Sequence, residues 1–269
     1  MDFLYSLPAP LLLVSALISG IAISCAGQIF VHSYFRNQSF IDHNEVGGVI
    51  IAVSGTLYAV LIGFLTFATW EHYQEAHELV VLESDADIDA WHTAVGLPPS
   101  LRDRVRADML EYAQVIATRE MAGMKHDEIN TKAGAITMDA MDAVGTLVPA
   151  NTGESNAQIA TMQQLTVIHD ARQQRIGFNR RGISRFEWLV LAIGATCIVC
   201  FCWLFGVRNS GVHLLMTSAV ATIIVSMLVL LFELQHPFRS SIGIGHEAWT
   251  RAIEHINSME AGKMKSMKM

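Results

Sequence analysis

The sequence predicts an all-α membrane protein with four transmembrane helices and a helical cytoplasmic domain inserted between helices 2 and 3. Two observations predict this class: 52% of the 269 residues are hydrophobic, and only 16% are charged. Four long windows contain no charged residue, namely 11–35, 47–70, 188–207 and 211–232. Each window meets the roughly 20 residues that a helix needs to cross about 30 Å of hydrocarbon. We therefore expect the lipid bilayer as a partner, and we expect neither a secreted enzyme nor a nucleic-acid-binding protein.

The first window is expected to be a retained helix. Its leading residues contain no Lys or Arg, and its apolar stretch is longer than the roughly 7 to 15 residues of a signal peptide. All four cysteines (Cys25, Cys197, Cys200 and Cys202) fall inside the predicted spans. A thiolate metal site is the alternative for the last three. A helix places Cys202 about 200° from Cys200, so we interpret the cysteines as small packing residues.

Basic residues predict the orientation. With four crossings, the N-terminus, residues 71–187 and the segment after 232 lie on one side, and only Arg36 and Arg208 lie on the other. The first side therefore holds 16 of the 18 basic residues. Those near the ends of its spans are Arg172, Arg175, Arg180, Arg181, Arg185, Arg239 and Arg251. The positive-inside rule then predicts a multi-pass protein whose termini and residues 71–187 are cytoplasmic.

The chain divides into four predicted segments. Residues 1–70 hold transmembrane helices 1 and 2, 71–187 the helical cytoplasmic domain, 188–235 transmembrane helices 3 and 4, and 236–269 a cytoplasmic C-terminal tail. The second span continues without Gly or Pro as far as Gly96, which predicts one rod of roughly 48 residues, about 70 Å long. Apolar residues at helical spacing predict further helices over 100–122, 127–148 and 154–179.

Several motifs resemble a known family. They are Gly-Thr-Leu-Tyr-Ala-Val-Leu-Ile-Gly-Phe at 55–64, Trp-Glu-His-Tyr-Gln-Glu-Ala at 70–76, Gly-Leu-Pro at 96–98 before an Arg-rich helix with Tyr112, and His-Pro-Phe at 236–238. Over roughly 45–250 the chain resembles the uncharacterised bacterial family of bestrophin-like membrane domains. Within the motifs, the expected structural positions are Tyr58, Gly63, Trp70, Pro237 and Phe238. The chain departs from the family pattern at Met121, where we expect Trp after Glu120.

The resemblance implies the bestrophin architecture. That architecture has four membrane helices, a helical cytosolic domain and a pentamer with an axial ion pore, here in a bacterial inner (cytoplasmic) membrane. Animal bestrophins bind calcium with an acidic cluster after a Pro-Phe motif, but residues 239–245 of this chain contain no acid. We therefore predict no calcium clasp and no cofactor.

A heptad-like row of residues runs along the predicted rod, and we call it the seam. Its steps of four and three residues place all members on one side of a helix. In the membrane the seam comprises Leu57, Leu61, Phe64 and Ala68; beyond it the seam comprises Glu71, Glu75, Glu78, Leu82, Asp85 and Asp89. If parallel rods surround an axis, the acids form carboxylate rings that attract cations, and the apolar members form a constriction that gates by dewetting. The alternative is a simple solvated face.

Other polar residues give weaker signals. Thr56, Thr66 and Thr69 lie near the seam, although such hydroxyls commonly bond to backbone carbonyls inside membrane helices. His72 with Glu71 or Glu75 is a conceivable pair of metal ligands, but the spacing matches no recognised motif, so we expect no metal site. His32 and His213 are the ionisable residues in the spans, and no catalytic motif is present, so we expect no enzyme.

Two functions remain open. The first is a homo-oligomeric ion channel, pentameric by resemblance and permeable to inorganic ions, with monovalent cations preferred because of the acidic seam. The second is a non-conducting membrane scaffold or signalling protein that acts through its cytoplasmic helices. In that case the seam is merely solvated, and Val80, Val81, Ile88 and Trp91 pack against neighbouring helices.

Overall fold

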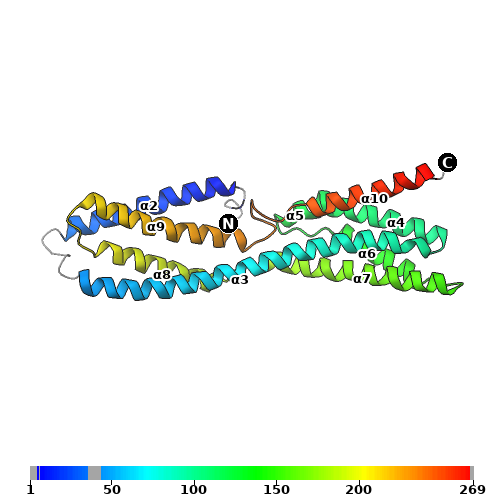
Figure 1. Ribbon diagram of the computed structural model, residues 1–269, viewed down its shortest axis with the longest axis horizontal. Coiled ribbons are helices and arrows are strands. Elements are labelled where there is room, and N and C mark those ends of the chain that lie inside the picture. Colours follow the sequence, from blue (N-terminus) through cyan, green and yellow to red (C-terminus); the bar gives the residue numbers. More distant parts are fainter. Residues whose placement is uncertain (1–4, 6, 36–43, 267–269) are drawn as a thin grey trace. The chain divides into compact units, whose positions relative to one another are not determined.

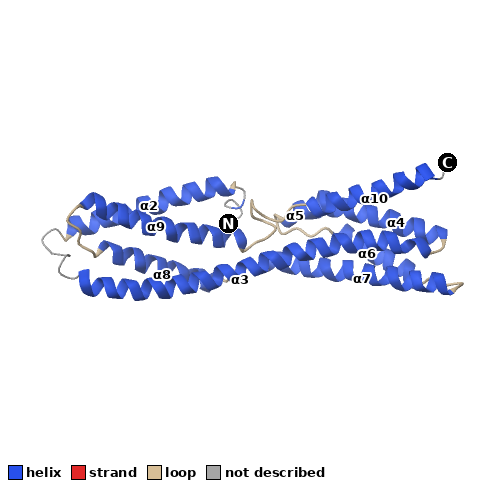
Figure 2. Cartoon of the chain, viewed as in Figure 1, coloured by secondary structure: helices blue, strands red, loops and turns tan. Residues whose placement is uncertain are grey.

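The structure is a computed structural model that describes residue 5 and residues 7–35 and 44–266. Within these ranges the ordered elements are helices joined by loops, and no strand occurs (Figure 2). The predicted all-helical class is confirmed for this part of the chain. Most of the predicted outer loop, including Arg36, lies outside the described residues. The chain separates into two compact units, which are described in turn.

Unit 1 contains residues 1–72, 182–235 and 240–242. Its helices are α2 (Ala9–Tyr34), the first part of α3 (Asn44–Thr93), α8 (Arg185–Trp203) and α9 (Ser210–Leu234), labelled in Figure 1. These four helices are long and apolar enough to cross a membrane, as the sequence predicts. The chain is therefore a membrane protein, and its candidate spans lie in unit 1.

Small residues let the helices of unit 1 approach closely. Gly27 of α2 lies directly against the indole of Trp203, and Trp203 Nε1 donates a hydrogen bond to the carbonyl of Ser24 at 2.9 Å. Gly20 lies in the same way against Val225 of α9. Such contacts stabilise membrane helix pairs because hydrocarbon solvent supplies no hydrophobic driving force between helices.

Helix α3 is a single helix of 50 residues, so the predicted long rod is confirmed. Its apolar stretch ends at Trp70, and residues 71–93 carry seven acidic residues and no Lys or Arg. A 3-10 turn (Ala94–Gly96) ends the helix, and Pro98 and Pro99 follow it. Proline cannot continue the backbone hydrogen-bond ladder of the preceding helix, which explains the stop at the predicted position.

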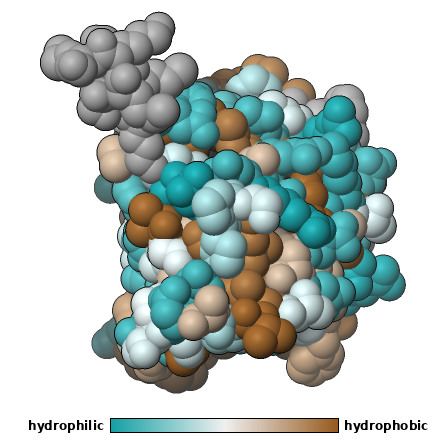
Figure 3. All heavy atoms as spheres, turned by 90° about the vertical axis from the view of Figure 1, so that its right-hand side faces the viewer, coloured by the Kyte–Doolittle hydropathy of each residue, from teal (hydrophilic) through white to brown (hydrophobic). Residues whose placement is uncertain are grey.

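Unit 2 contains residues 73–181, 236–239 and 243–269. Besides the second part of α3, its helices are α4 (Pro99–Val115), a π-helical turn (Ile116–Glu120), α5 (Met121–Met124), α6 (Thr131–Gly145), α7 (Thr152–Arg180) and α10 (Glu247–Ser266). The core contains Trp91, Tyr112 and Trp249, all at most 1% exposed. On the face of unit 2 shown in Figure 3, hydrophilic residues predominate and hydrophobic ones are scattered among them.

Two features of unit 2 differ from the sequence expectations. The sequence predicts a tail over residues 236–269. Within it, residues 247–266 form α10, whose Trp249 and Ile256 are fully buried. Ile129 and Ile159, expected on apolar helix faces, are 42% and 55% exposed. Ile129 precedes α6, and on α7 Thr161 is buried instead of Ile159, so the contact face is rotated from the one that apolar residues alone predict.

Candidate functional site

The seam of α3 is exposed along its whole length. In the apolar part, Leu57, Leu61 and Phe64 are 67%, 37% and 71% exposed, and Ala68 is exposed as well. In the acidic part, the side chains of Glu71, Glu75, Glu78, Leu82, Asp85 and Asp89 are all exposed. One chain therefore presents a row of ten residues that are exposed within the described part of the chain.

The seam is distinct from the face of α3 that packs inside the chain. Glu83 and Asp87 lie within the same stretch of helix as the acidic seam, yet both are fully buried. Val80 and Trp91, which the scaffold hypothesis expects to pack against neighbouring helices, are 1% exposed and pack within unit 2. From residue 71 onward, the acids of α3 thus divide into an exposed row and a buried pair on a different face.

Tyr58, from the first family motif, joins α3 to α8. Its ring packs against Gly194, where an added Cβ would lie 2.5 Å from Tyr58 Cδ2, and its hydroxyl donates to the carbonyl of Leu191 at 3.2 Å. Tyr58 and Ile62 are buried, and they lie between the exposed seam positions of the same helix. This packing sets the rotation of α3, which explains why the seam faces away from α8.

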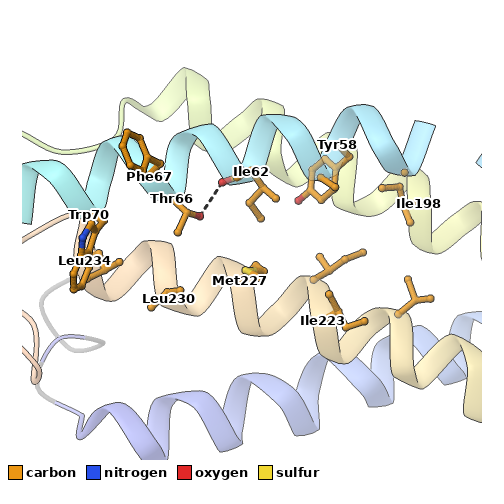
Figure 4. Close-up of a pocket in the computed structure, with 15 residues that line it drawn as sticks. Tyr58, Ile62, Thr66, Phe67, Trp70, Ile198, Ile223, Met227, Leu230 and Leu234 are labelled. Carbon is orange, nitrogen blue, oxygen red and sulfur yellow. Dashed lines mark hydrogen bonds between the residues drawn. The ribbon is translucent and has the colours of Figure 1, made fainter. Parts of the chain in front are cut away.

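An apolar cavity of about 710 Å³ lies in unit 1 between α3, α8 and α9 (Figure 4). Tyr58, Gly63 and Trp70 of the family motifs line it from α3, and Met227 and Leu230 line it from α9. Gly63 has no neighbour within 4 Å of the position a Cβ would take, and Trp70 is 46% exposed. The motif residues therefore contribute to this cavity and do not extend the seam.

The threonine hydroxyls near the seam are engaged within the helix. Thr56, Thr66 and Thr69 donate to the carbonyls of the residues four positions earlier, at 2.8, 2.8 and 2.6 Å. The bond from Thr66 to the carbonyl of Ile62 is drawn in Figure 4. These hydroxyls therefore bond to backbone carbonyls of α3, as is common inside membrane helices.

A network of buried charges fixes the part of α3 that lies in unit 2. Arg175 of α7 donates to both oxygens of Glu83, at 2.6 and 3.0 Å, and to Glu120 at 2.7 Å. Arg172 donates to Glu120 at 2.8 Å, and the hydroxyl of Tyr112 donates to Glu83 at 2.5 Å. The π-helical turn ends at Glu120 and so places its carboxylate between the two guanidinium groups.

The protonation of this network follows from burial and charge. Burial alone would lower the pKa of Arg175, but the carboxylates of Glu83 and Glu120 outweigh it and raise that pKa. Burial and the negative charge of Glu83 raise the pKa of the Tyr112 hydroxyl. Asp87 has no hydrogen-bond partner on either carboxylate oxygen, and burial with nearby Glu83 raises its pKa well above the ordinary value. Two guanidinium groups therefore face two carboxylates, and Asp87, near Glu83, favours the neutral form.

No motif in the sequence predicts this network. By sequence, Arg172 and Arg175 are basic residues near a span end, and the structure pairs both with carboxylates inside unit 2. The one sequence signal was helical spacing. Arg172 and Arg175 continue the steps of three and four residues that place Leu165 and Ile168 on the apolar side of α7.

The last family motif forms a turn after α9. Pro237 is buried, and its carbonyl accepts a hydrogen bond from the amide of Ile244 at 2.7 Å. Phe238 is 1% exposed and belongs to the core of unit 2. Arg239 lies 3.2 Å from Asp127 in an ion pair. The motif residues Pro237 and Phe238 are thus buried in the turn that follows α9.

No group of three or more potential metal ligands (His, Cys, Asp or Glu) converges anywhere in the described residues. The four cysteines are free. Cys202 is buried, Cys25 and Cys200 are half-buried, and Cys197 is exposed on α8. These positions are consistent with packing residues inside apolar helices.

Comparison with known proteins gives a family and a fold. No curated protein matches the sequence. A crystal structure of a membrane protein variant superposes with a TM-score of 0.67 at 13% identity, covering 89% of this chain and 96% of the other. A bacterial bestrophin homologue from Klebsiella pneumoniae, solved as two single-residue variants, gives TM-scores of 0.66 and 0.64 at 13% and 12% identity. These matches cover 91% and 89% of this chain and 98% and 97% of the homologue. The model of the bestrophin-like domain matches residues 19–249, so the chain belongs to the bestrophin-like domain family.

Proposed function

We propose that this protein is a subunit of a homo-oligomeric ion channel whose axial pore is lined by the seam of α3. The observation that carries the proposal is the continuous exposure of the ten seam residues, which no packing within the chain explains. Parallel copies around an axis would enclose the whole row.

The two parts of the seam would act differently in such a pore. Rings of Leu57, Leu61 and Phe64 would form an apolar constriction, which excludes ions when it loses water. Rings of Glu71, Glu75 and Glu78 would concentrate cations at one mouth and repel anions. The channel would then prefer monovalent cations, and the apolar rings would act as its gate.

Family membership supports the same function. The superposition with a bacterial bestrophin homologue extends over nearly the whole chain, so the fold accommodates a bestrophin-like arrangement. We infer a pentamer in the bacterial inner membrane, with unit 2 and both termini in the cytoplasm. We also infer that the protein is not an enzyme. Native mass measurement in mild detergent should give five chains, and a monodisperse monomer would contradict the axial pore.

The gate is tested by Phe64→Ala. Removing the aromatic side chain from every subunit widens the constriction and makes it easier to wet, so ion flux through reconstituted liposomes should rise. Phe67→Ala is the matched control, because Phe67 lies on the same helix, is 59% exposed and lines the apolar cavity, not the seam. Equal flux in both variants and the natural protein would exclude Phe64 as the gate.

The acidic rings are tested by replacing Glu71, Glu75 and Glu78 together with Gln. The change preserves size and helix propensity but removes three charges per subunit, so the reversal potential should show weaker cation selectivity. The effect should be larger at low salt, because exposed charges are screened over about 10 Å at 0.1 M. Glu254→Gln with Glu260→Gln, both exposed on α10, is the control.

The competing function is a non-conducting scaffold. If the Phe64 and triple Gln variants assemble normally and leave flux and reversal potential unchanged, α3 does not line a pore. Pentameric assembly without flux would favour the scaffold.

A further inference from the structure

Two histidines that are far apart in the sequence meet in unit 2. His92 lies in the last turn of α3, and His255 lies on α10, 163 positions later. Their Nε2 atoms are 3.4 Å apart, and their ring centroids are 5.7 Å apart. For a hydrogen bond between nitrogens this separation is long, since N–H donors usually lie about 2.7 to 3.2 Å from the acceptor.

The distance fits a shared metal ion better. Zinc binds imidazole nitrogen at about 2.0 to 2.1 Å with tetrahedral angles, which places two nitrogen ligands of one ion about 3.3 to 3.4 Å apart. Imidazole also suits copper and nickel, but oxygen ligands are preferred by calcium and magnesium. The pair therefore has the ligand type and the nitrogen separation of one edge of a zinc coordination tetrahedron.

The surroundings position His92 and leave His255 free to adjust. The His92 ring packs edge-on against Trp91, which is 1% exposed, and the guanidinium of Arg106 covers the Trp91 ring at 4.3 Å. His255 is exposed, so rotation of its side chain can open the angle between the two rings, and an ion can enter from solution. This combination gives one rigid ligand and one adaptable ligand.

We propose that His92 and His255 form a binding site for a divalent transition metal ion, with Zn²⁺ as the expected ion. Among the described residues no third His, Cys, Asp or Glu joins the pair, so water completes the coordination. Asp89 on α3 and Arg251 on α10 are exposed and lie one turn from the pair. Because their charges are opposite, their effects on a bound cation oppose each other. The affinity for the metal ion therefore rests on the two imidazole nitrogens. The bound ion would link α10 to the end of α3.

The test is a Zn²⁺ titration of the purified full-length chain, with any affinity tag removed, in competition with a chromogenic chelator. The natural protein should bind one Zn²⁺ per chain at this site. His255→Ala should weaken binding at least about tenfold, since even indirect partners of a metal site change affinity by that factor. His92→Gln should do the same, and His255→Ala, at an exposed position, remains informative if His92→Gln does not fold.

The matched control is His77→Ala, which removes an exposed histidine from the same helix without touching the pair. It should bind Zn²⁺ like the natural protein. In addition, Zn²⁺ should raise the unfolding temperature of the natural protein and the His77 variant but not of His255→Ala, because a ligand that binds only the folded state stabilises it. Equal Zn²⁺ affinity in the natural protein and His255→Ala, or an equal loss in His77→Ala, would overturn the proposal.

Discussion

Arg175 is a fully buried cation, and both of its carboxylate partners are fully buried too. Removing one member of a buried ion pair leaves uncompensated charge in a medium of low polarity. Arg175→Ala would strand Glu83 and Glu120, since only Arg172 would remain beside Glu120. The network is therefore the place in unit 2 where single substitutions should be most damaging.

We expect Arg175→Ala to destabilise unit 2 by about 3 to 5 kcal/mol, as measured by chemical unfolding followed by tryptophan fluorescence. The control is Lys132→Ala, which breaks the exposed pair with Glu111 and should cost about 1 kcal/mol or less. Similar losses for the two variants would show that burial of the network contributes nothing.

Asp87 predicts a dependence of stability on pH. Because its pKa is raised in the folded state, the native protein holds this proton more tightly than the unfolded chain does. Stability contributed by Asp87 therefore falls as pH rises from the ordinary value of 3.8 through the raised pKa. Asp87→Asn should flatten the dependence in that range and raise the unfolding midpoint at neutral pH. An unchanged pH profile in the variant would contradict this assignment.

At the scale of elements, the contact between Tyr58 and Gly194 determines how α3 packs on α8. Gly194→Ala places a methyl group in the position of the Tyr58 ring, so the two helices must separate. We expect a destabilisation of about 1 to 3 kcal/mol, typical of overpacking, seen as a lower melting temperature in detergent. Gly48→Ala on α3 is the control, since its added Cβ meets nothing within 4 Å and should not lower the melting temperature.

Helix α10 shows how an amphipathic element escapes sequence analysis. Its buried residues Trp249, Ala252 and Ile256 recur at intervals of three and four, which is a helical pattern. The pattern is present in the sequence, but four methionines and three lysines follow Ile256 and the segment comes after Pro237, so it resembles a tail. Packing against α4 stabilises the helix in unit 2.

At the scale of the whole molecule, orientation in the membrane remains a prediction of the charge distribution. A tag fused after Met269 should resist protease added to intact cells, because the positive-inside rule places the C-terminus in the cytoplasm. The control is the same digestion after the membrane is permeabilised, which should remove the tag. Cleavage in intact cells would invert the predicted topology.

The sequence by itself determined the four apolar helices, the continuous rod of α3 and the family. Each depends on local information: uncharged length, absence of Gly and Pro, and short motifs such as that around Tyr58. It also identified the seam, because helical spacing specifies which residues share a side of one helix. Periodicity in the sequence cannot show which faces of a helix are covered by neighbouring helices.

Only the tertiary structure decided which charges are buried and which histidines meet. Glu83 and Arg175 are 92 positions apart, and His92 and His255 are 163 apart, so neither pair leaves a periodic trace in the sequence. On α3 an exposed Asp85 and a buried Asp87 have the same chemistry and differ only in the neighbours that folding brings to them. Burial is a property of the packed helices, and it was packing that separated the exposed acidic row from the structural ion network.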